Sequence, residues 1–287
     1  MSTHPVTQSL PAEATFARTL IAVDGSVEAL RAVRQIDRLA PVDAQITIAI
    51  AAVIAPNVAE EVLSIDPHGA AGKALRERAE AALREASAAL AHHEARTQTL
   101  VGPPAPTLLL EARRSSTSLL AVGSHGIPRG TGILLGSVAT VALHQAPCDV
   151  FVARGELPAD GDRPLEILVG FDASPGAHQA LATSLALASR LHARVQAVLA
   201  LDDLEVPEET VQASFTAVAP AALTLESTAQ SATDALLGRA ADLIVVGSRG
   251  LGGIRALGSV SERVGHRARC SVLVVRHDGP VRQPPVH

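Results

Sequence analysis

Three glycines and a serine, in the pattern Gly123-x2-Gly126-x9-Gly136-Ser137, have the clearest chemical meaning in this chain. They follow a short apolar run, residues 119–122, that predicts a strand, and they lead into a helical pattern. Glycines at a strand end permit positive φ angles and close backbone approach, and Ser137 stands where an N-cap hydroxyl would lie. Because backbone N–H groups and the positive end of a helix dipole bind anions, the spacing predicts a phosphate-binding loop.

An aspartate, Asp24, stands directly after another apolar run, residues 20–23, and is followed by Gly25 and Ser26. In a doubly wound sheet, ligands bind beyond the carboxyl ends of the strands where the strand order reverses, commonly between the first and fourth strands. Asp24 and Gly123 would then meet at one crevice. Taken alone, Asp24 would be a turn residue, because Asp-Gly is a strong turn pair, and a single glycine would simply make a tight turn. The combination favours a ligand site.

The same landmarks occur a second time along the chain. Asp172 follows an apolar run, and Gly247-x2-Gly250 is followed by Gly258-Ser259. Only seven residues separate Gly250 from Gly258, and two missing residues remove roughly 7 Å of maximal reach. We therefore expect the helix start to be displaced from the strand end, so that this second site is weak or absent. The alternative is a loop that contracts without moving its ends, since Gly252 and Gly253 permit unusual backbone angles. The region 202–220 is short and irregular where the first copy has a long helical pattern, so that helix should be reduced or lost.

Strands alternate with helical patterns in both copies, which predicts an α/β fold of two tandem doubly wound, five-stranded parallel-sheet domains. The expected segments are an N-terminal tail at 1–17, a first domain at 18–154, a linker at 155–164, a second domain at 165–277 and a C-terminal tail at 278–287. The last strands, residues 150–153 and 272–275, are short apolar edges that must be covered. We expect them to lie side by side about a pseudo-twofold axis, with Cys148 and Cys270 filling small buried sites rather than forming a disulfide.

Composition restricts the class of protein. Hydrophobic residues make up 47% of the chain and aromatic residues only 1%, which suits a parallel sheet covered by helices. The net charge of −5 and the absence of a Lys/Arg block argue against nucleic acid as a partner. No signal-type segment or run of 18 apolar residues is present, so we expect a cytoplasmic protein that does not bind membranes. The eleven histidines are scattered, His92 and His93 included, and are interpreted as solvated side chains rather than metal ligands.

These motifs, a strand ending in Val-Asp-Gly-Ser, and the closing segments APCDVFVAR and RCSVLVVR resemble the universal stress protein family in its tandem form. The resemblance covers nearly all of residues 18–277. It implies five-stranded parallel sheets and, in the nucleotide-binding branch, ATP with its adenine near the first and second strands. Carried over, the ATP-binding residues would be Asp24 and Val53 near the adenosine, and Gly123, Gly126, Gly136, Ser137 and Val138 in the phosphate loop. The second, doubtful site would comprise Asp172, Gly247, Gly250, Gly258 and Ser259.

The resulting functional hypothesis is an ATP-binding stress or regulatory protein that is not an enzyme. Mg²⁺ could arrive with the phosphates and need few protein ligands. Two alternatives stay open: a nucleotide-free interaction module, and a very slow ATPase, since no credible catalytic base accompanies the loop. The expected partners are an adenine nucleotide and an unidentified protein. The chain would be either a homodimer or a pseudo-dimeric monomer, in which the two copies play the part of two subunits.

Overall fold

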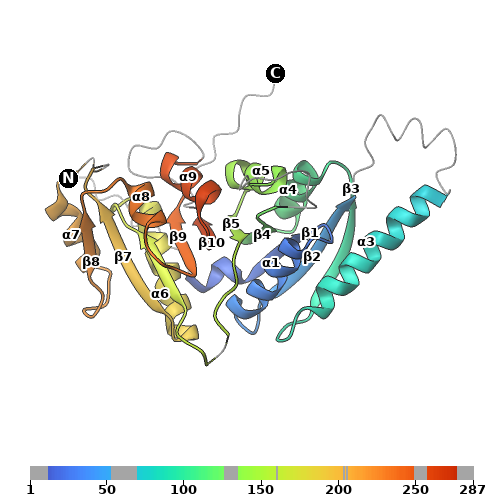
Figure 1. The fold of residues 1–287 in the computed structure, drawn as a ribbon, viewed down its shortest axis with the longest axis horizontal. Helices are drawn as coiled ribbons and strands as arrows, with labels where there is room; N and C mark the ends of the chain where they lie inside the picture. Colours follow the sequence, from blue (N-terminus) through green and yellow to red (C-terminus); the bar gives the residue numbers. More distant parts are fainter. Residues whose placement is uncertain are drawn as a thin grey trace, which may run out of the picture.

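A computed structural model of the protein describes residues 12–52, 70–125, 135–159, 161–202, 204, 206–248 and 257–276. The strands of the first half are β1 (Arg18–Val23), β2 (Gln45–Ala52), β3 (Ala95–Val101), β4 (Leu119–Gly123) and β5 (Asp149–Ala153). Those of the second half are β6 (Glu166–Gly170), β7 (Arg194–Ala200), β8 (Leu225–Thr228), β9 (Leu243–Gly247) and β10 (Ser271–Val275). Together they form one ten-stranded sheet in the order β3-β2-β1-β4-β5-β10-β9-β6-β7-β8 (Figure 1).

Helices cover both faces of this sheet, and each face has its own apolar core. The first half contains α1 (Val27–Leu39), α3 (Ala70–Ala88), α4 (Pro104–Arg114) and α5 (Ser137–Gln145). The second contains α6 (Pro175–Leu191), α7 (Glu208–Thr216), α8 (Ala232–Leu237) and α9 (Ser259–Arg267). Buried side chains of α1, α3, α6 and α7 share one core, and those of α4, α5, α8 and α9 share the other. Each core is continuous across the two halves, so the halves are packed as one body.

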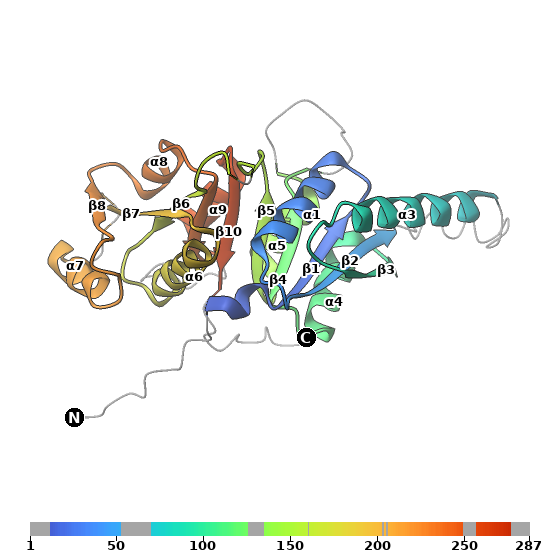
Figure 2. The same ribbon diagram turned by 90° about the horizontal axis from the view of Figure 1, so that it is seen from below.

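The two halves meet at their last strands, as the sequence predicts. β5 and β10 pair in antiparallel fashion, with Val272 opposite Val152 and Val274 opposite Val150, whereas all other strand pairs are parallel. Both strands lie side by side in the middle of the molecule in Figures 1 and 2. The pairing satisfies the hydrogen-bonding groups that each five-stranded sheet would otherwise leave at an apolar edge. The expected fold class, two doubly wound parallel sheets in tandem, is confirmed.

The region 202–220 departs from the sequence expectation, whereas the two cysteines are unpaired as expected. The region 202–220 is not irregular, because α7 occupies nine residues of it; this helix is reduced relative to the nineteen residues of α3, but it is not lost. Its Phe215 packs edge to face on Phe171, with ring centroids 5.3 Å apart, and that buried contact holds the short helix on the sheet. Cys148 is buried and Cys270 half-buried, and both are free thiols.

The interpretation of all histidines as solvated is wrong for His93. Its imidazole and the carboxylate of Asp37 are each 4% exposed, and His93 Nδ1 lies 2.9 Å from Asp37 Oδ1. The carboxylate also accepts hydrogen bonds from the backbone N–H groups of Ala91, His92 and His93, directly after the turn that ends α3. Asp37 lies on α1, so the pair depends on a contact between distant segments that the sequence pattern does not reveal. No helix in the described part of the chain is long and apolar enough to cross a membrane.

Candidate functional site

The carboxyl ends of β1 and β4 form the edge at which the sequence motifs meet. β1 lies between β2 and β4, so the strand order reverses there. The pairing of β1 with β4 stops at Ile21 and Ala121, although the strands continue to Val23 and Gly123. The strands therefore separate over their last residues. Asp24 and the glycine turn follow at the two sides of this opening, which is where a ligand of a doubly wound sheet binds.

Asp24 has a structural part in starting α1. Its Oδ1 accepts a hydrogen bond of 3.0 Å from the Ser26 N–H, and the Ser26 hydroxyl accepts one of 3.2 Å from the Ala29 N–H. Asp24 thus acts as a turn residue, as the Asp-Gly pair indicates. The residue is nevertheless exposed, and its Oδ2 has no hydrogen-bond partner among the described residues. One carboxylate oxygen therefore fixes the turn, and the other is left to accept a hydrogen bond from outside it.

Gly123 is needed for packing rather than for an unusual backbone angle. Its φ is not positive, and a Cβ there would lie 2.7 Å from the Glu28 carbonyl carbon and 2.9 Å from the Ala29 nitrogen. Real Cβ atoms do not approach backbone atoms this closely, so only glycine lets the end of β4 touch the first turn of α1. The close approach that this glycine permits is therefore to the backbone of α1, and its contact with phosphate stays a prediction. This contact sets the distance between the glycine turn and Asp24.

The start of α5 differs in detail from the sequence expectation. Gly136, with φ −62° and ψ 156°, is the N-cap, and Ser137 is the first helical residue rather than the capping one. The Gly136 N–H donates to the Ser124 carbonyl at 2.8 Å, which ties the start of α5 to the end of β4. Ser137 is exposed and Val138 half-buried in the first turn of the helix. Val53 and Gly126, which also belong to the expected site, lie outside the described residues.

The first N–H groups of α5 are left without a side-chain cap in the described part of the chain. Ser26, Ser174 and Ser231 supply such a cap to α1, α6 and α8, respectively. Every α-helix begins with N–H groups that have no partner within the helix, and the dipole gives this end a partial positive charge. At α5 these donors lie beside the strand opening. α4, α7 and α9 also begin without a side-chain cap, so the feature that distinguishes α5 within the first half is its place at the strand opening.

The corresponding edge of the second half repeats this geometry. Asp172 Oδ1 accepts from the Ser174 N–H at 2.9 Å, and a Cβ on Gly247 would lie 2.5 Å from the carbonyl carbon of Gly176. Gly258 is the N-cap residue of α9, which has no side-chain cap. Its N–H donates to the Ser248 carbonyl at 2.6 Å. Ser259 is exposed at the first position of that helix, and Gly250 lies outside the described residues.

The expected displacement of α9 is therefore wrong. Gly136 and Gly258 make the same backbone hydrogen bond to the serine that follows their strand, although the second loop is two residues shorter. The deletion thus leaves the two ends of the loop in place. Loop length alone is a poor guide here, because the distance between strand and helix is fixed by packing.

His125 lies in the first glycine turn. Its Nδ1 is 3.0 Å from the Ser124 hydroxyl, and its buried Nε2 has no hydrogen-bond partner among the described residues.

Comparison with known proteins identifies the family. The family model described as "Universal stress protein family" matches residues 15–154 and 224–276, and a universal stress protein of Mycolicibacterium smegmatis is 30% identical over 296 residues. The chain belongs to the universal stress protein family. That alignment spans 90% of this chain and 96% of the mycobacterial protein. A universal stress protein of Mycobacterium tuberculosis is 33% identical over 183 residues, which cover 55% of this chain and 61% of the relative.

Solved structures of the family share the fold. A universal stress protein from Archaeoglobus fulgidus superimposes with a TM-score of 0.64 at 20% sequence identity, over 91% of this chain and 98% of that chain. The tandem arrangement of this universal stress protein is thus a recurring architecture. The family model leaves out residues 155–223, which include β6, α6, β7 and α7. The second half therefore departs from the family most in its opening segments.

Proposed function

We propose that the first half of this universal stress protein binds an adenine nucleotide, ATP foremost, and that nucleotide occupancy regulates its interaction with a protein partner. The observation that carries the proposal is the uncapped start of α5 beside the Asp24 carboxylate at the separated ends of β1 and β4. The N–H donors of α5 would receive the phosphates, and Asp24 Oδ2 would accept a hydrogen bond from the adenosine part. The opening between the strands would hold the nucleotide across the sheet edge.

A binding role fits these groups better than catalysis. Hydrolysis needs a base that is placed to activate water. Asp24 is engaged with the Ser26 N–H, and His125 Nδ1 lies against the Ser124 hydroxyl. We therefore propose a regulator in which any ATP turnover is very slow. Mg²⁺ would enter with the phosphates and keep most of its water ligands.

The second half is proposed to bind nucleotide more weakly. The shortened loop no longer supports this asymmetry, because Gly258 is held as Gly136 is. The support that stays is α7, which covers the sheet over nine residues where α3 extends over nineteen. A smaller covering helix leaves the ligand more exposed to water.

The proposal is tested by placing a carboxylate on the anion site without disturbing the fold. Ser137 is exposed at the first position of α5, where an acidic side chain stabilises a helix but repels a phosphate. Ser137→Glu should weaken ATP binding at least tenfold in calorimetric titration, with unfolding by urea unchanged or slightly more resistant. Ser259→Glu at the matched position of α9 should leave the tight site intact.

The stoichiometry of the same titration separates the alternatives. About one ATP per chain supports the asymmetric protein, and two equal sites would show that both halves bind. Wild-type affinity in Ser137→Glu would mean that nucleotide binds elsewhere. No detectable binding of ATP, ADP or AMP by the wild-type chain would favour the nucleotide-free interaction module.

A further inference from the structure

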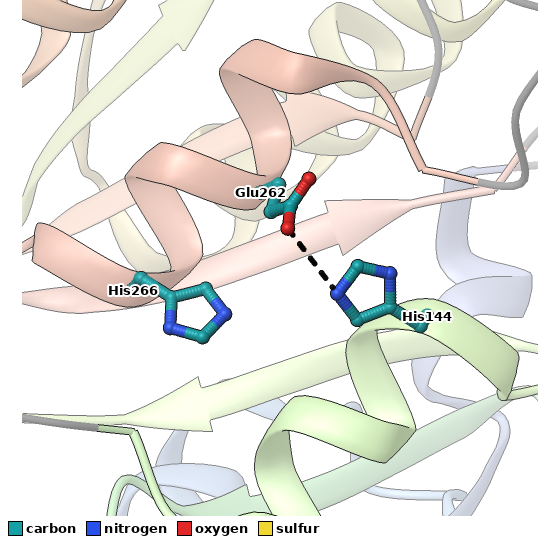
Figure 3. A group of neighbouring side chains, drawn as sticks. All are labelled: His144, Glu262 and His266. Atoms are coloured by element: carbon teal, nitrogen blue, oxygen red, sulfur yellow. Dashed lines mark ion pairs between the residues drawn. The ribbon is translucent and has the colours of Figure 1, made fainter.

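Three side chains with metal-binding chemistry meet where the two halves of the molecule join. His144 projects from α5, and Glu262 and His266 project from α9 towards it (Figure 3). One ligand atom of each lies within 4.8 Å of the other two, and His144 Nε2 is 3.5 Å from Glu262 Oε1. All three side chains are partly exposed, so an ion can reach them from solvent. No sequence pattern indicates this cluster, because His144 is far from the other two residues along the chain.

The two histidines occupy equivalent positions of the internal repeat. α5 and α9 are each the last helix of their half, nine residues long, and His144 and His266 are both the eighth residue of their helix. The antiparallel pairing of β5 with β10 brings these helices together near the pseudo-twofold axis. Glu262 lies four residues before His266, on the same face of α9, so it adds a carboxylate to the histidine pair.

The helices that carry the ligands are held close by complementary residues. Leu143 and Gly265, again equivalent positions, lie against each other, and a Cβ on Gly265 would be 2.6 Å from Leu143 Cδ1. Two leucines could not occupy this place near the axis. The missing side chain lets α9 approach α5, which places the neighbouring histidines opposite one another.

Equivalent arginines fasten the ends of both helices across the junction. Arg276 follows β10 and donates to the Leu143 carbonyl of α5 at 2.6 Å, and Arg154 follows β5 and donates to the His266 carbonyl of α9 at 3.3 Å. These cations sit at the negative ends of the helix dipoles, and each bond goes to a backbone carbonyl. Their positive charge opposes a metal ion nearby, so a bound ion would need the Glu262 carboxylate.

We propose that His144, Glu262 and His266 bind one divalent transition-metal ion, zinc by ligand preference, which bridges the two halves of the chain. Two imidazole nitrogens and one carboxylate oxygen are a ligand set that zinc accepts, with water in the fourth position. The ligand atoms, which now lie up to 4.8 Å apart, must close to about 3.4 Å, the separation in a tetrahedral site with bonds of about 2.1 Å. Rotation of partly exposed side chains supplies this movement. The proposal does not depend on nucleotide binding.

The first test is zinc titration of the tag-free, metal-stripped full chain in competition with a chromogenic chelator. We expect one zinc ion per chain, with affinity reduced at least tenfold in each of His144→Gln, Glu262→Gln and His266→Gln. His92→Gln is the matched control, because the His92 side chain is exposed, its backbone N–H binds Asp37, and it is not part of the cluster; this variant should bind zinc as the wild type does. Far-ultraviolet circular dichroism checks that every variant is folded.

The second test asks whether the ion lies between the two halves and away from the thiols. Zinc should raise the midpoint of thermal unfolding of the wild type and not of Glu262→Gln. Cobalt(II) in place of zinc should give visible ligand-field bands without a thiolate charge-transfer band, since Cys148 and Cys270 are not ligands. Unchanged zinc affinity in all three ligand variants, or the absence of stoichiometric binding by the wild type, would overturn the proposal and leave His144 and Glu262 as a plain ion pair.

Discussion

The two halves of this universal stress protein agree closely at the strand opening and diverge away from it. Asp24 and Asp172 make the same turn contact, Gly123 and Gly247 make the same approach to a helix, and Gly136 and Gly258 make the same hydrogen bond. The helices that cover the sheet differ in length, with nineteen residues in α3 and nine in α7. Some equivalent positions also carry different side chains, such as Asp37 and Leu185. The comparison teaches that packing holds the backbone of the opening independently of the loop that crosses it.

The largest expected effect tests the strand-end glycines. Gly123→Ala and Gly247→Ala each place a Cβ less than 3 Å from helix backbone atoms, which cannot move as a flexible side chain would. We expect each to destabilise the protein by about 3 kcal/mol, as overpacking against backbone does. Urea unfolding measures the loss. A much smaller loss at Gly247 than at Gly123 would break the equivalence of the two halves.

Asp37 gives the first half an acid-sensitive contact that the equivalent position of the second half does not repeat. Burial alone would raise the pKa of Asp37, but hydrogen bonds from the Ala91 N–H, the His93 ring and the His92 N–H outweigh it and hold this pKa below its usual value. Leu185 stands at the equivalent position of α6. A lowered pKa means that the ionised carboxylate stabilises the folded state above pH about 4 and that this contribution is lost as the pH falls further.

Asp37→Asn should therefore cost about 2 kcal/mol at neutral pH, because an amide offers only one acceptor oxygen to several N–H donors. The difference in the free energy of unfolding between Asp37→Asn and the wild type should shrink towards pH 3. Urea unfolding at both pH values measures it. A difference that is the same at both would show that the charge of Asp37 has no part in the effect.

The contact between Leu143 and Gly265 tests the junction of the two halves. Gly265→Ala should cost about 1.5 kcal/mol, since its Cβ would press on the end of a flexible leucine side chain. Leu143→Ala should cost about 2.5 kcal/mol through the cavity it leaves. If the new Cβ at residue 265 and the Leu143 side chain compete for the same volume, the double variant should lose less free energy of unfolding than the two single variants together. Strict additivity would show that α5 and α9 are not held by this pair.

The smallest expected changes in stability are at two equivalent positions that both have a positive φ. Gly25 has φ +83°, and the equivalent Ala173 has φ +62°, where an alanine is strained. Gly25→Ala meets only an ordinary contact of 3.6 Å, so its cost of about 1 kcal/mol should come from the backbone angle alone. Ala173→Gly should stabilise by about 0.5 kcal/mol, because relief of strain exceeds the added freedom of the unfolded chain. Thermal unfolding resolves both signs, and a destabilising Ala173→Gly would contradict the strain at this turn.

The sequence by itself determined the α/β class, the duplication and the pairing of the last strands. Each of these follows from local patterns: alternating strands and helices, glycines after a strand, and apolar edges that need a partner. It also indicated that Asp24 and Gly123 belong to one edge, because the strand order of a doubly wound sheet follows from right-handed crossovers. These rules can be applied to a sequence without coordinates.

Only the tertiary structure decided what the glycines contact, where α9 begins, and which histidines meet. The role of Gly123 depends on the Glu28 backbone, and the position of Gly258 depends on the Ser248 carbonyl, so neither could be predicted from spacing within a loop. His144 and His266 meet because an antiparallel strand pair superposes the two ends of the repeat. Contacts of this kind are set by the packing of whole elements, and the distance along the chain carries no information about them.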